Sequence, residues 1–539
     1  MPTFAELVEA RAHDEHAGLR FEDETYSWAR VVLEARKRAA LALALRDPGR
    51  PFHVGVLLDN VPEYVFWIFG AALAGAAVVG VNPTRRGAEL AADIRHTDSL
   101  FLVTDSTLAG LLDGMDLGVP LLLADSPDYR TSLASREGAS RTVPGSEPLL
   151  LLFTSGSTGA PKAVICSQER LAEIAAHGVV FGIGPDAVTY IAMPLFHGNA
   201  VMANLAMATH GGATVALRRR FSASGFLPDI RKFGVTYFNY VGRALAYILA
   251  TPERQDDAEN TLAAAFGTEA SARDMAEFGR RFGCHIIEGY GSSEGVIAIS
   301  KTPGTPPDAL GLAGEGVDLA VHDPETGLEC PRAVFDGARR LVNAHDAIGE
   351  IVRRGATFEG YYNNPEADAR RLRDGWYWSG DLGYRDQDGY FYFAGRDADW
   401  LRVDGENFAA APVERILARY PPVIMCAVYA VPDARTGDQV MATLELSGSF
   451  DPDGFARFLA EQPDLGTKWA PRFVRITREM PLTPTNKVAK TGLRRERWEC
   501  ADPVFWRPGR ESRYLPMAGA DRAELRKRFS ESGREQFLL

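Results

Sequence analysis

A loop rich in glycine and hydroxyl side chains limits what this chain can fold into more than any other segment. It reads TSGSTGAPK, from Thr154 to Lys162, and it directly follows the apolar run LLLLF. Gly156 and Gly159 allow backbone conformations in which consecutive N–H groups converge on an anion. Further donors come from Thr154, Ser155, Ser157, Thr158 and the ammonium of Lys162. The segment therefore predicts a buried strand that ends in a phosphate-binding loop.

The alternative interpretation of this segment is a flexible Ser/Gly connection between a strand and a helix. The loop also lacks the Gly-Lys-Ser/Thr ending of the Walker pattern. The preceding strand, the Ser/Thr/Gly composition and the terminal lysine nevertheless all favour binding of a phosphate. Only eight of the 59 basic residues are lysines, so a lysine at this place is less easily explained as ordinary solvated surface.

Bulk composition indicates a folded protein with more than one domain. At 539 residues the chain exceeds what one hydrophobic core usually organises. Its 46% hydrophobic and 24% charged residues are ordinary for a soluble globular protein. The net charge is −12 and no basic block is present, which argues against nucleic acid as a partner.

The cysteines and the apolar segments favour a cytoplasmic protein. Five cysteines are scattered without CxxC spacing, which favours a reducing compartment with no disulfide framework and no zinc site. The charged N-terminal segment MPTFAELVEARAHDEH has a helical pattern and is no secretory signal. The apolar run from Val65 to Val81 is slightly short for a membrane span and rich in Gly and Ala. We therefore expect a buried helix that leads into a buried strand, and no membrane span.

Strand-like and helix-like patterns alternate along the chain. Apolar runs at 53–58, 148–156 and 188–196 are typical of strands, and the segment 225–233 is typical of a helix. Such alternation predicts an α/β fold in which helices cover the faces of β-sheets.

The clearest candidate for a domain boundary is GRDADW at 395–400, which follows the hairpin signal DQDGYFYFAGR. Beyond it the chain has a strand pattern of its own, for example at 423–433 and 440–446. We therefore predict a large N-terminal domain over residues 1–396 and a small mobile C-terminal α+β domain over residues 397–539.

Four further motifs follow the phosphate loop in order: EGYGSSE at 288–294, WYWSGD at 376–381, GRDADWLRVDGEN at 395–407 and PLTPTNK at 481–487. Together these motifs resemble the adenylate-forming superfamily of acyl-CoA synthetases, peptide-synthetase adenylation domains and luciferases. The variants SSEG, DWLRVDGEN and PTNK look most like its long- and very-long-chain acyl-CoA synthetase branch, which includes fatty-acid transport proteins and actinobacterial lipid or steroid-side-chain ligases. The resemblance runs from about residue 50 to about residue 495.

The resemblance implies a ligase that uses ATP, Mg²⁺ and coenzyme A. A small-molecule carboxylic acid would attack the α-phosphate of ATP to form an acyl-adenylate, and the thiol of coenzyme A would then take the acyl group. Mg²⁺ and the loop would hold the departing pyrophosphate in line. A homodimer is compatible with the sequence and is not indicated by any motif.

Residues of the EGYGSSE motif are assigned to the metal and the adenine. Glu294 offers the hard carboxylate oxygen that Mg²⁺ prefers, and the alternative is a carboxylate at a helix start. Tyr290, set between Gly289 and Gly291, can lay its ring on adenine, and the alternative is a core aromatic. Glu288 and Ser293 complete the predicted nucleotide residues of this motif.

Asp381 and Arg396 are assigned to the ribose. Asp381 follows Gly380 at an expected strand end, where a carboxylate can accept both ribose hydroxyls. Arg396 could join it on the ribose or a phosphate, and the alternative is an ion pair with Asp381 or Asp397.

Lys487 is the predicted catalytic lysine, on a Pro/Thr-rich loop of the small domain. From there it can neutralise the carboxylate substrate and the oxygen that bridges to the α-phosphate. Lys490 is expected to be solvated. The resemblance implies that the small domain then turns, withdraws Lys487 and presents the 402–407 strand, with Gly405, Glu406 and Asn407, to the pantetheine arm of coenzyme A.

The acyl pocket is predicted around His197 and the segment YFNYV. His197 lies where the family has a gate between the acyl pocket and the coenzyme A tunnel, although a lone His is more often structural. The other predicted pocket residues are Asn199, Tyr237, Asn239, Tyr240, Val241, Gly289 and Gly291. Such a pocket would suit a bulky hydrophobic acid, whether fatty, steroid or terpenoid.

Three departures from the family pattern leave other functions open: Ala398 at the hinge, Asp404 in the following strand motif and Asn486 in the lysine loop. An enzyme that only transfers the acyl group of a supplied adenylate to coenzyme A remains one alternative. An enzyme that loads a separate carrier protein, and a ligand-binding protein without activity, are two others.

Overall fold

The computed structural model describes residues 2–153, 162–241, 244–268, 270, 272–302, 304–306, 308–337, 341–396, 400–403, 406–434, 438–462, 465–466, 468–483, 487–509, 513–532 and 534–538. The predicted phosphate-loop residues Thr154, Ser155, Gly156, Ser157, Thr158 and Gly159, and Gly405, lie outside these ranges. So do the side chains of Arg396, Glu406 and Asn407.

Two large sheets with mostly parallel strands form the N-terminal part. The first has the order β15-β14-β13-β12-β11-β9-β10-β1-β2 and the second has the order β6-β5-β3-β4-β7-β8. The strands of the first sheet are β1 (Ala17–Phe21), β2 (Glu24–Ser27), β9 (Val188–Ile191), β10 (Thr214–Leu217), β11 (Tyr237–Val241), β12 (Ala264–Thr268), β13 (His285–Gly291), β14 (Ala298–Ser300) and β15 (Leu312–Ala313). Those of the second are β3 (His53–Leu57), β4 (Ala77–Gly80), β5 (Phe101–Thr104), β6 (Leu121–Leu123), β7 (Pro148–Phe153) and β8 (Ala163–Ser167).

Helices cover these sheets, and one large core cluster joins residues of both sheets to the helices between them. Helix α3 packs against α1 and α2, and α7 packs against α9. The helices of this part are α1 (Phe4–Glu9), α2 (Trp28–Ala44), α3 (Pro62–Ala74), α4 (Gly87–His96), α5 (Ser106–Ala109), α6 (Pro127–Ala134), α7 (Gln168–Ala176), α8 (Gly198–Ala200), α9 (Ala206–Gly211), α10 (Ala223–Phe233), α11 (Ala244–Leu249) and α12 (Ala272–Phe282). Short turns of other helical type are η1 (Gly110–Leu112), η2 (His177–Phe181) and η3 (Val201–Leu205).

The apolar run from Val65 to Val81 forms a buried helix followed by a buried strand, which confirms that prediction. Pro62 opens α3, and Gly75 ends it in the left-handed conformation with φ of 72°. The helix is buried all round, as expected for a helix that is apolar on every face, and the following β4 is buried as well. Among the described residues, no helix combines the length and apolar character that a membrane crossing requires.

A third sheet follows in the chain, with the order β16-β17-β19-β18 and with β20 paired to β19. Its strands are β16 (Leu319–His322), β17 (Gly349–Arg354), β18 (Leu372–Arg373), β19 (Trp376–Arg385) and β20 (Phe391–Arg396), with α13 (Ala344–Ala347) and α14 (Pro365–Arg371) between them. The predicted hairpin is the β19–β20 pair, whose register places Arg385 opposite Phe391.

The C-terminal part has a sheet of its own, which confirms the smaller second domain. The order is β23-β24-β25-β26-β27, beside the separate pair β21-β22. The strands are β21 (Trp400–Val403), β22 (Glu406–Ala409), β23 (Val423–Pro432), β24 (Asp438–Leu446), β25 (Phe473–Thr477), β26 (Val504–Trp506) and β27 (Leu515–Pro516). The helices are α15 (Ala410–Leu417), α16 (Pro452–Ala460), α17 (Lys490–Glu496) and α18 (Gly519–Glu531), with the turn η5 (Glu535–Leu538).

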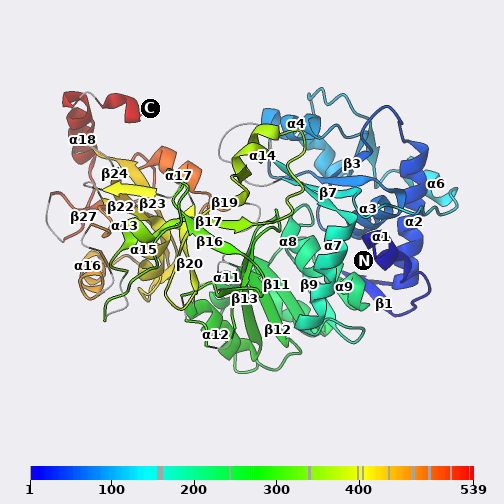
Figure 1. Cartoon of the computed structure of the whole chain (residues 1–539), viewed down its shortest axis with the longest axis horizontal. Coiled ribbons are helices and arrows are strands. Elements are labelled where there is room, and N and C mark those ends of the chain that lie inside the picture. The colour runs from blue at the N-terminus through cyan, green and yellow to red at the C-terminus, as the bar shows by residue number, and fades with distance from the viewer. Residues whose placement is uncertain are drawn as a thin grey trace.

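Side chains of β23 alternate between two separate core clusters. Cys426 and Val428 belong to one cluster, and Ala427 and Tyr429 belong to the other. This is the period of two that a strand buried on both faces requires. In Figure 1 the C-terminal part lies at the left, the first two sheets lie at the centre and right, and β16, β17 and β19 lie between them. The exact boundary at 396/397 stays a prediction.

Gly80 is a test of how tightly the two large sheets are packed. A Cβ at this position, at the end of β4, would lie 2.8 Å from the carbonyl oxygen and 3.0 Å from the Cα of Phe196. Since both are backbone atoms, we expect Gly80→Ala to lower the free energy of unfolding by about 1–3 kcal/mol. Urea denaturation followed by circular dichroism measures this. Gly184→Ala is the control, because its Cβ would meet nothing within 4 Å, and equal losses in both variants would contradict the interpretation.

Candidate active site

The candidate site lies at the carboxyl edge of the first sheet. Strands β9, β11, β12 and β13 run parallel, so the segments that follow them meet at the same edge. His197 follows β9, and the turn that carries Glu294 follows β13. This is the edge of an open α/β sheet at which ligands usually bind.

Lys162, the last residue of the predicted phosphate loop, leads directly into β8 and lies beside Tyr361. Its Nζ is 5.9 Å from the centre of the Tyr361 ring. Burial lowers the pKa of the Lys162 ammonium, and the nearby cations Arg371 and Arg370 lower it further, while Glu294 opposes them. The structure thus brings the loop lysine and the candidate metal ligand into one electrostatic cluster.

Glu294 is buried, with 7% of its surface exposed. Its Oε1 accepts a hydrogen bond of 2.6 Å from the Tyr361 hydroxyl. Burial by itself would raise the pKa of this carboxyl, but the Tyr361 hydroxyl and the Arg371 guanidinium outweigh it and hold the pKa below its usual range. Glu294 is therefore a carboxylate at neutral pH, which is the state a metal ligand needs.

Arg170, from α7, holds the turn that carries Glu294. Its Nη2 donates to the carbonyl oxygen of Ser293 at 2.8 Å, and its Nη1 donates to Glu359 Oε2 at 3.2 Å. The guanidinium also packs against Gly295, whose φ is 60°. A side chain at Gly295 would collide with Arg170 and would also strain the backbone.

Tyr290 and Asp381, predicted from two different motifs, are joined directly. The Tyr290 hydroxyl donates to Asp381 Oδ2 at 2.7 Å, and Asp381 is buried. The expectation that Asp381 lies at a strand end is wrong, because it lies inside β19. Gly380, with φ of 73°, creates an irregularity there that interrupts the register with β17 and turns the strand locally.

Two other predicted nucleotide residues are placed by their backbones or by the fold. Arg396 pairs with Asp381 in the backbone register of β19 and β20. Glu288 Oε1 accepts from the backbone N–H of Ala270 at 2.7 Å, and Glu288 Oε2 lies 3.4 Å from Lys301 Nζ. Glu288 thus ties the middle of β13 to the segment before α12.

On the acyl side, His197 caps the short helix α8. Its Nδ1 accepts from the backbone N–H of Asn199 at 3.3 Å. Asn239 Nδ2 donates to Asn199 Oδ1 at 2.6 Å, and Asn204 Nδ2 donates to Asn239 Oδ1 at 2.7 Å. Asn204 belongs to η3, a π-helical turn, which is a feature found frequently at functional sites. A chain of hydrogen-bonded amides therefore links β11 to α8.

The predicted pocket residues of β11 are divided between the two faces of the sheet. Tyr237 donates to the carbonyl oxygen of Ala203 at 2.8 Å, so it faces η3 together with Asn239. Tyr240 lies on the opposite face, where it packs next to Phe238 and covers Gly267. Gly289 lies near Phe266, since a Cβ there would be 3.3 Å from that ring. Tyr240 is thus separated from the amide chain by the strand itself.

Lys487 lies on a closed loop of the C-terminal domain. The backbone N–H of Thr483 donates to the carbonyl oxygen of Lys487 at 2.6 Å, and the Lys487 N–H donates to Thr483 Oγ1 at 3.2 Å. The expectation that Lys490 is solvated is wrong, because its Nζ lies 2.9 Å from Glu414 Oε1 and its side chain is 17% exposed. Lys490 therefore fastens α17 to α15.

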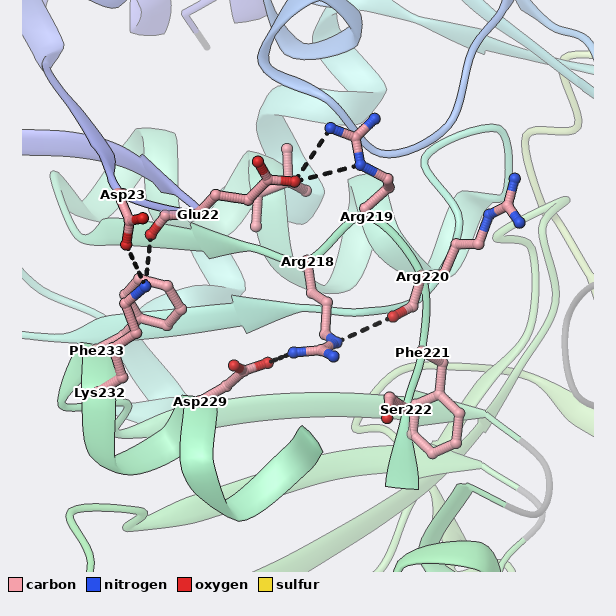
Figure 2. A pocket seen from close by; sticks show the side chains of 11 residues that line it. Glu22, Asp23, Arg218, Arg219, Arg220, Phe221, Ser222, Asp229, Lys232 and Phe233 are labelled. Atoms are coloured by element: carbon pink, nitrogen blue, oxygen red, sulfur yellow. Dashed lines mark hydrogen bonds and ion pairs between the residues drawn. The ribbon is translucent and has the colours of Figure 1, made fainter. Parts of the chain in front are cut away.

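A pocket of about 470 Å³ lies elsewhere, beyond the carboxyl end of β10. Figure 2 shows three pairs of opposite charge in which the side chains point toward each other: Arg218 and Asp229, Arg219 and Glu22, and Lys232 and Asp23. Arg218 pairs with Asp229, Arg219 with Glu22 and Lys232 with Asp23, and Arg220 pairs with Asp59 outside the labelled group. Because these cations are paired with carboxylates, the pocket has no surplus charge for an anionic ligand.

The sequence interpretation missed Tyr361 and Arg371. Tyr361 lies in GYYNNPE and Arg371 ends α14. No spacing rule connects a tyrosine and an arginine at these positions to a carboxylate 67 residues before the tyrosine. Only the fold brings them together.

A large α/β domain followed by a smaller C-terminal domain is the fold class of adenylate-forming enzymes. The family model described as AMP-binding enzyme matches residues 7–362, and the model described as AMP-binding enzyme C-terminal domain matches residues 412–487. The chain therefore belongs to the AMP-binding enzyme family, and the predicted resemblance is confirmed.

Curated relatives match the chain almost end to end. A steroid-22-oyl-CoA synthetase of Rhodococcus jostii is 52% identical, with 99% of each chain covered. The medium/long-chain-fatty-acid–CoA ligase FadD17 of Mycobacterium marinum is 45% identical, with 94% of this chain and 98% of that protein covered. The prediction of an enzyme of the acyl-CoA ligase class is confirmed by these relatives.

Solved structures support the fold. An anthranilate CoA ligase in complex with anthranoyl-AMP superposes with a TM-score of 0.79 at 23% identity, over 92% of this chain and 96% of that chain. ATP-bound MatB from Rhodopseudomonas palustris superposes with a TM-score of 0.77 at 23% identity, over 91% and 97%. The predicted α/β architecture is thereby confirmed.

The bond between Tyr290 and Asp381 can be tested by AMP binding. If Asp381 binds the ribose as predicted, loss of the hydrogen bond that holds it should raise the Kd for AMP about tenfold in Tyr290→Phe. Isothermal titration calorimetry measures the Kd for AMP in the wild type and in each variant. Tyr190→Phe is the matched control, because the Tyr190 hydroxyl also donates to a carboxylate, Asp229, at 2.7 Å. An unchanged Kd in Tyr290→Phe, or equal weakening in the control, would contradict the assignment.

Proposed function

We propose that this protein is an ATP-dependent ligase that joins a bulky hydrophobic carboxylic acid to coenzyme A through an acyl-adenylate. The single observation that carries the proposal is the cluster of Lys162, Glu294 and Tyr361 close to the Tyr290–Asp381 pair. A cation and a carboxylate suited to a metal-bound triphosphate thus lie at the same edge as a carboxylate suited to ribose.

In the first half-reaction the protein orients the nucleotide and the acid. Lys162 would bind the triphosphate, and Asp381, held by Tyr290, would accept the ribose hydroxyls. Glu294 fits Mg²⁺ because it is a buried, ionised oxygen donor. When bound there, Mg²⁺ supplies neutralisation of charge on the triphosphate. Lys487 would stabilise the charge that develops as the carboxylate attacks the α-phosphate.

In the second half-reaction the small domain would turn about the segment after β20. This rotation would withdraw Lys487 and bring the β21–β22 pair, with Gly405, Glu406 and Asn407, to the pantetheine arm of coenzyme A. The thiolate attacks the acyl carbon, the bond to the phosphate oxygen breaks, and AMP leaves. His197, at the start of α8, would gate the acyl pocket from the thiol.

The substrate class rests on the relatives and on the aromatic wall beside the amide chain. A steroid-22-oyl-CoA synthetase and medium/long-chain fatty-acid ligases are the relatives at 52% and 45% identity. The Phe181 ring lies 5.8 Å from that of Tyr237 and 4.8 Å from that of Phe266. We therefore favour a steroid-side-chain or long fatty acid. A cytoplasmic location and a homodimer stay predictions.

A panel of acids tests the substrate class. Each methylene buried in an apolar pocket contributes about 0.8 kcal/mol, so a steroid C22 acid or an acid of about ten carbons should have a kcat/KM at least a hundredfold above that of acetate. The measurement is coenzyme A ester formation, with a phosphopantetheinyl carrier protein as alternative acceptor. A higher kcat/KM for acetate than for the larger acids would contradict the hydrophobic acyl pocket. Acylation of the carrier protein alone would contradict coenzyme A as the acyl acceptor.

Lys487→Ala tests the two-step mechanism. Loss of a preorganised charge should slow acyl-adenylate formation about a hundredfold, while thioesterification of supplied acyl-adenylate should change less than about tenfold, since the lysine would then lie away from the site. Lys490→Ala is the control, because that lysine lies three residues further on, at the start of α17, and pairs with Glu414. Equal losses in both steps would contradict domain alternation. A wild type that uses only supplied adenylate would establish the half-reaction specialist instead.

A further inference from the structure

We propose that Tyr361 is a positioning residue that holds Glu294 for the metal-bound nucleotide and couples it, through Arg371, to the ribose carboxylate. The proposal rests on the proposed function, because it assigns a task within that same site. Tyr361 does not reach the reacting atoms in this argument; it acts through Glu294.

The backbone around Tyr361 is fixed to the strand that leaves the phosphate loop. The N–H of Ile165 donates to the carbonyl oxygen of Gly360 at 3.1 Å, and the N–H of Tyr362 donates to the carbonyl oxygen of Ala163 at 2.8 Å. These bonds extend β8 by a short antiparallel bridge at Tyr361. The position of Tyr361 is therefore tied to that of Lys162, which immediately precedes β8.

The phenol of Tyr361 contacts charged groups on two sides. Its hydroxyl donates to Glu294 Oε1 at 2.6 Å and accepts from Arg371 Nε at 3.1 Å. The direction of both bonds is forced, because a guanidinium can only donate and a carboxylate can only accept. Tyr361 itself is 3% exposed, so water does not replace these bonds easily. The hydroxyl thus fixes the rotation of the Glu294 carboxylate.

Arg371 extends the contact toward the ribose side of the site. Its Nη1 donates to the carbonyl oxygen of Trp378 at 3.1 Å. The guanidinium also packs against Gly380, where a Cβ would collide with it. Gly380 directly precedes Asp381, so one arginine supports both the tyrosine behind Glu294 and the irregular turn of β19 that presents Asp381. Movement at either end is transmitted through this side chain.

Tyr362 offers a matched comparison within the same segment. Its hydroxyl donates to Asp98 Oδ2 at 2.9 Å, which is the same kind of bond to a carboxylate. Its ring, however, lies 4.9 Å from the ring of His53 and faces the second sheet rather than Glu294. Tyr361→Phe and Tyr362→Phe therefore remove similar hydrogen bonds from adjacent residues, and only the first bond touches the candidate site.

The experiment compares these two variants by calorimetry and by half-reactions. ATP binding is titrated at a series of Mg²⁺ concentrations in the absence of acid. Tyr361→Phe should raise the Mg²⁺ concentration for half-maximal ATP binding about tenfold and slow adenylate formation about tenfold to hundredfold. Thioesterification of supplied acyl-adenylate should change less than about threefold, because that step does not use the pyrophosphate site. Tyr362→Phe should leave the Mg²⁺ concentration for half-maximal ATP binding, the rate of adenylate formation and the rate of thioesterification within about twofold of the wild type.

A second variant, Arg371→Lys, tests the same contact from its other side. Arg371→Lys, which keeps the charge but loses the Nε donor, should show the same split between the half-reactions with a smaller loss, and it replaces Tyr361→Phe if that variant fails to fold by circular dichroism. An unchanged Mg²⁺ dependence in Tyr361→Phe, or equal losses in Tyr361→Phe and Tyr362→Phe, would overturn the positioning role. A wild type that binds ATP with Mg²⁺ yet forms no coenzyme A ester would instead refute the proposed function.

Discussion

A buried carboxylate is the constraint on which the rest of the site depends. Glu294 is 7% exposed, and a buried charge is strongly destabilising unless it is paired and hydrogen-bonded. The hydrogen bond from Tyr361 and the charge of Arg371 meet this requirement, and both residues arrive from a segment that is paired with β8. The charge is therefore stabilised where β8, the turn after β13 and α14 come together.

Close approach of backbones at glycine positions makes this docking possible. Gly80 leaves room for the backbone of Phe196 directly before His197, and a Cβ at Gly198 would lie 3.6 Å from Ser293 Oγ. The second sheet and the Glu294 turn thus approach α8 closely, with the side chains of Leu152 and Ser293 against Gly198. Glycine destabilises regular structure because it loses more conformational entropy on folding than other residues. At these places it allows three elements to approach one site closely.

Sequence patterns could predict the elements and the motifs but not the partners of the motifs. The apolar strands, the buried helix after Pro62 and the two-domain division follow from periodicity and length, which are local properties. The pattern predicts Asp381 at a strand end, whereas the irregularity at Gly380 lets β19 continue beyond it. Tyr361 could not be found at all, because its role depends on a contact 67 residues away in sequence.

The interface between the two domains bears on whether the proposed rotation is physically reasonable. Arg415 Nη1 donates to the carbonyl oxygen of Phe393 at 3.0 Å, and Tyr247 of α11 packs against the core cluster behind β23. Among the described residues, these contacts are a hydrogen bond to a main-chain carbonyl and the packing of one aromatic side chain. Each domain has hydrophobic clusters of its own. Lys487 and the β21–β22 pair belong to the same small domain, and a rotation of that domain would therefore exchange one for the other at the site without unfolding either core.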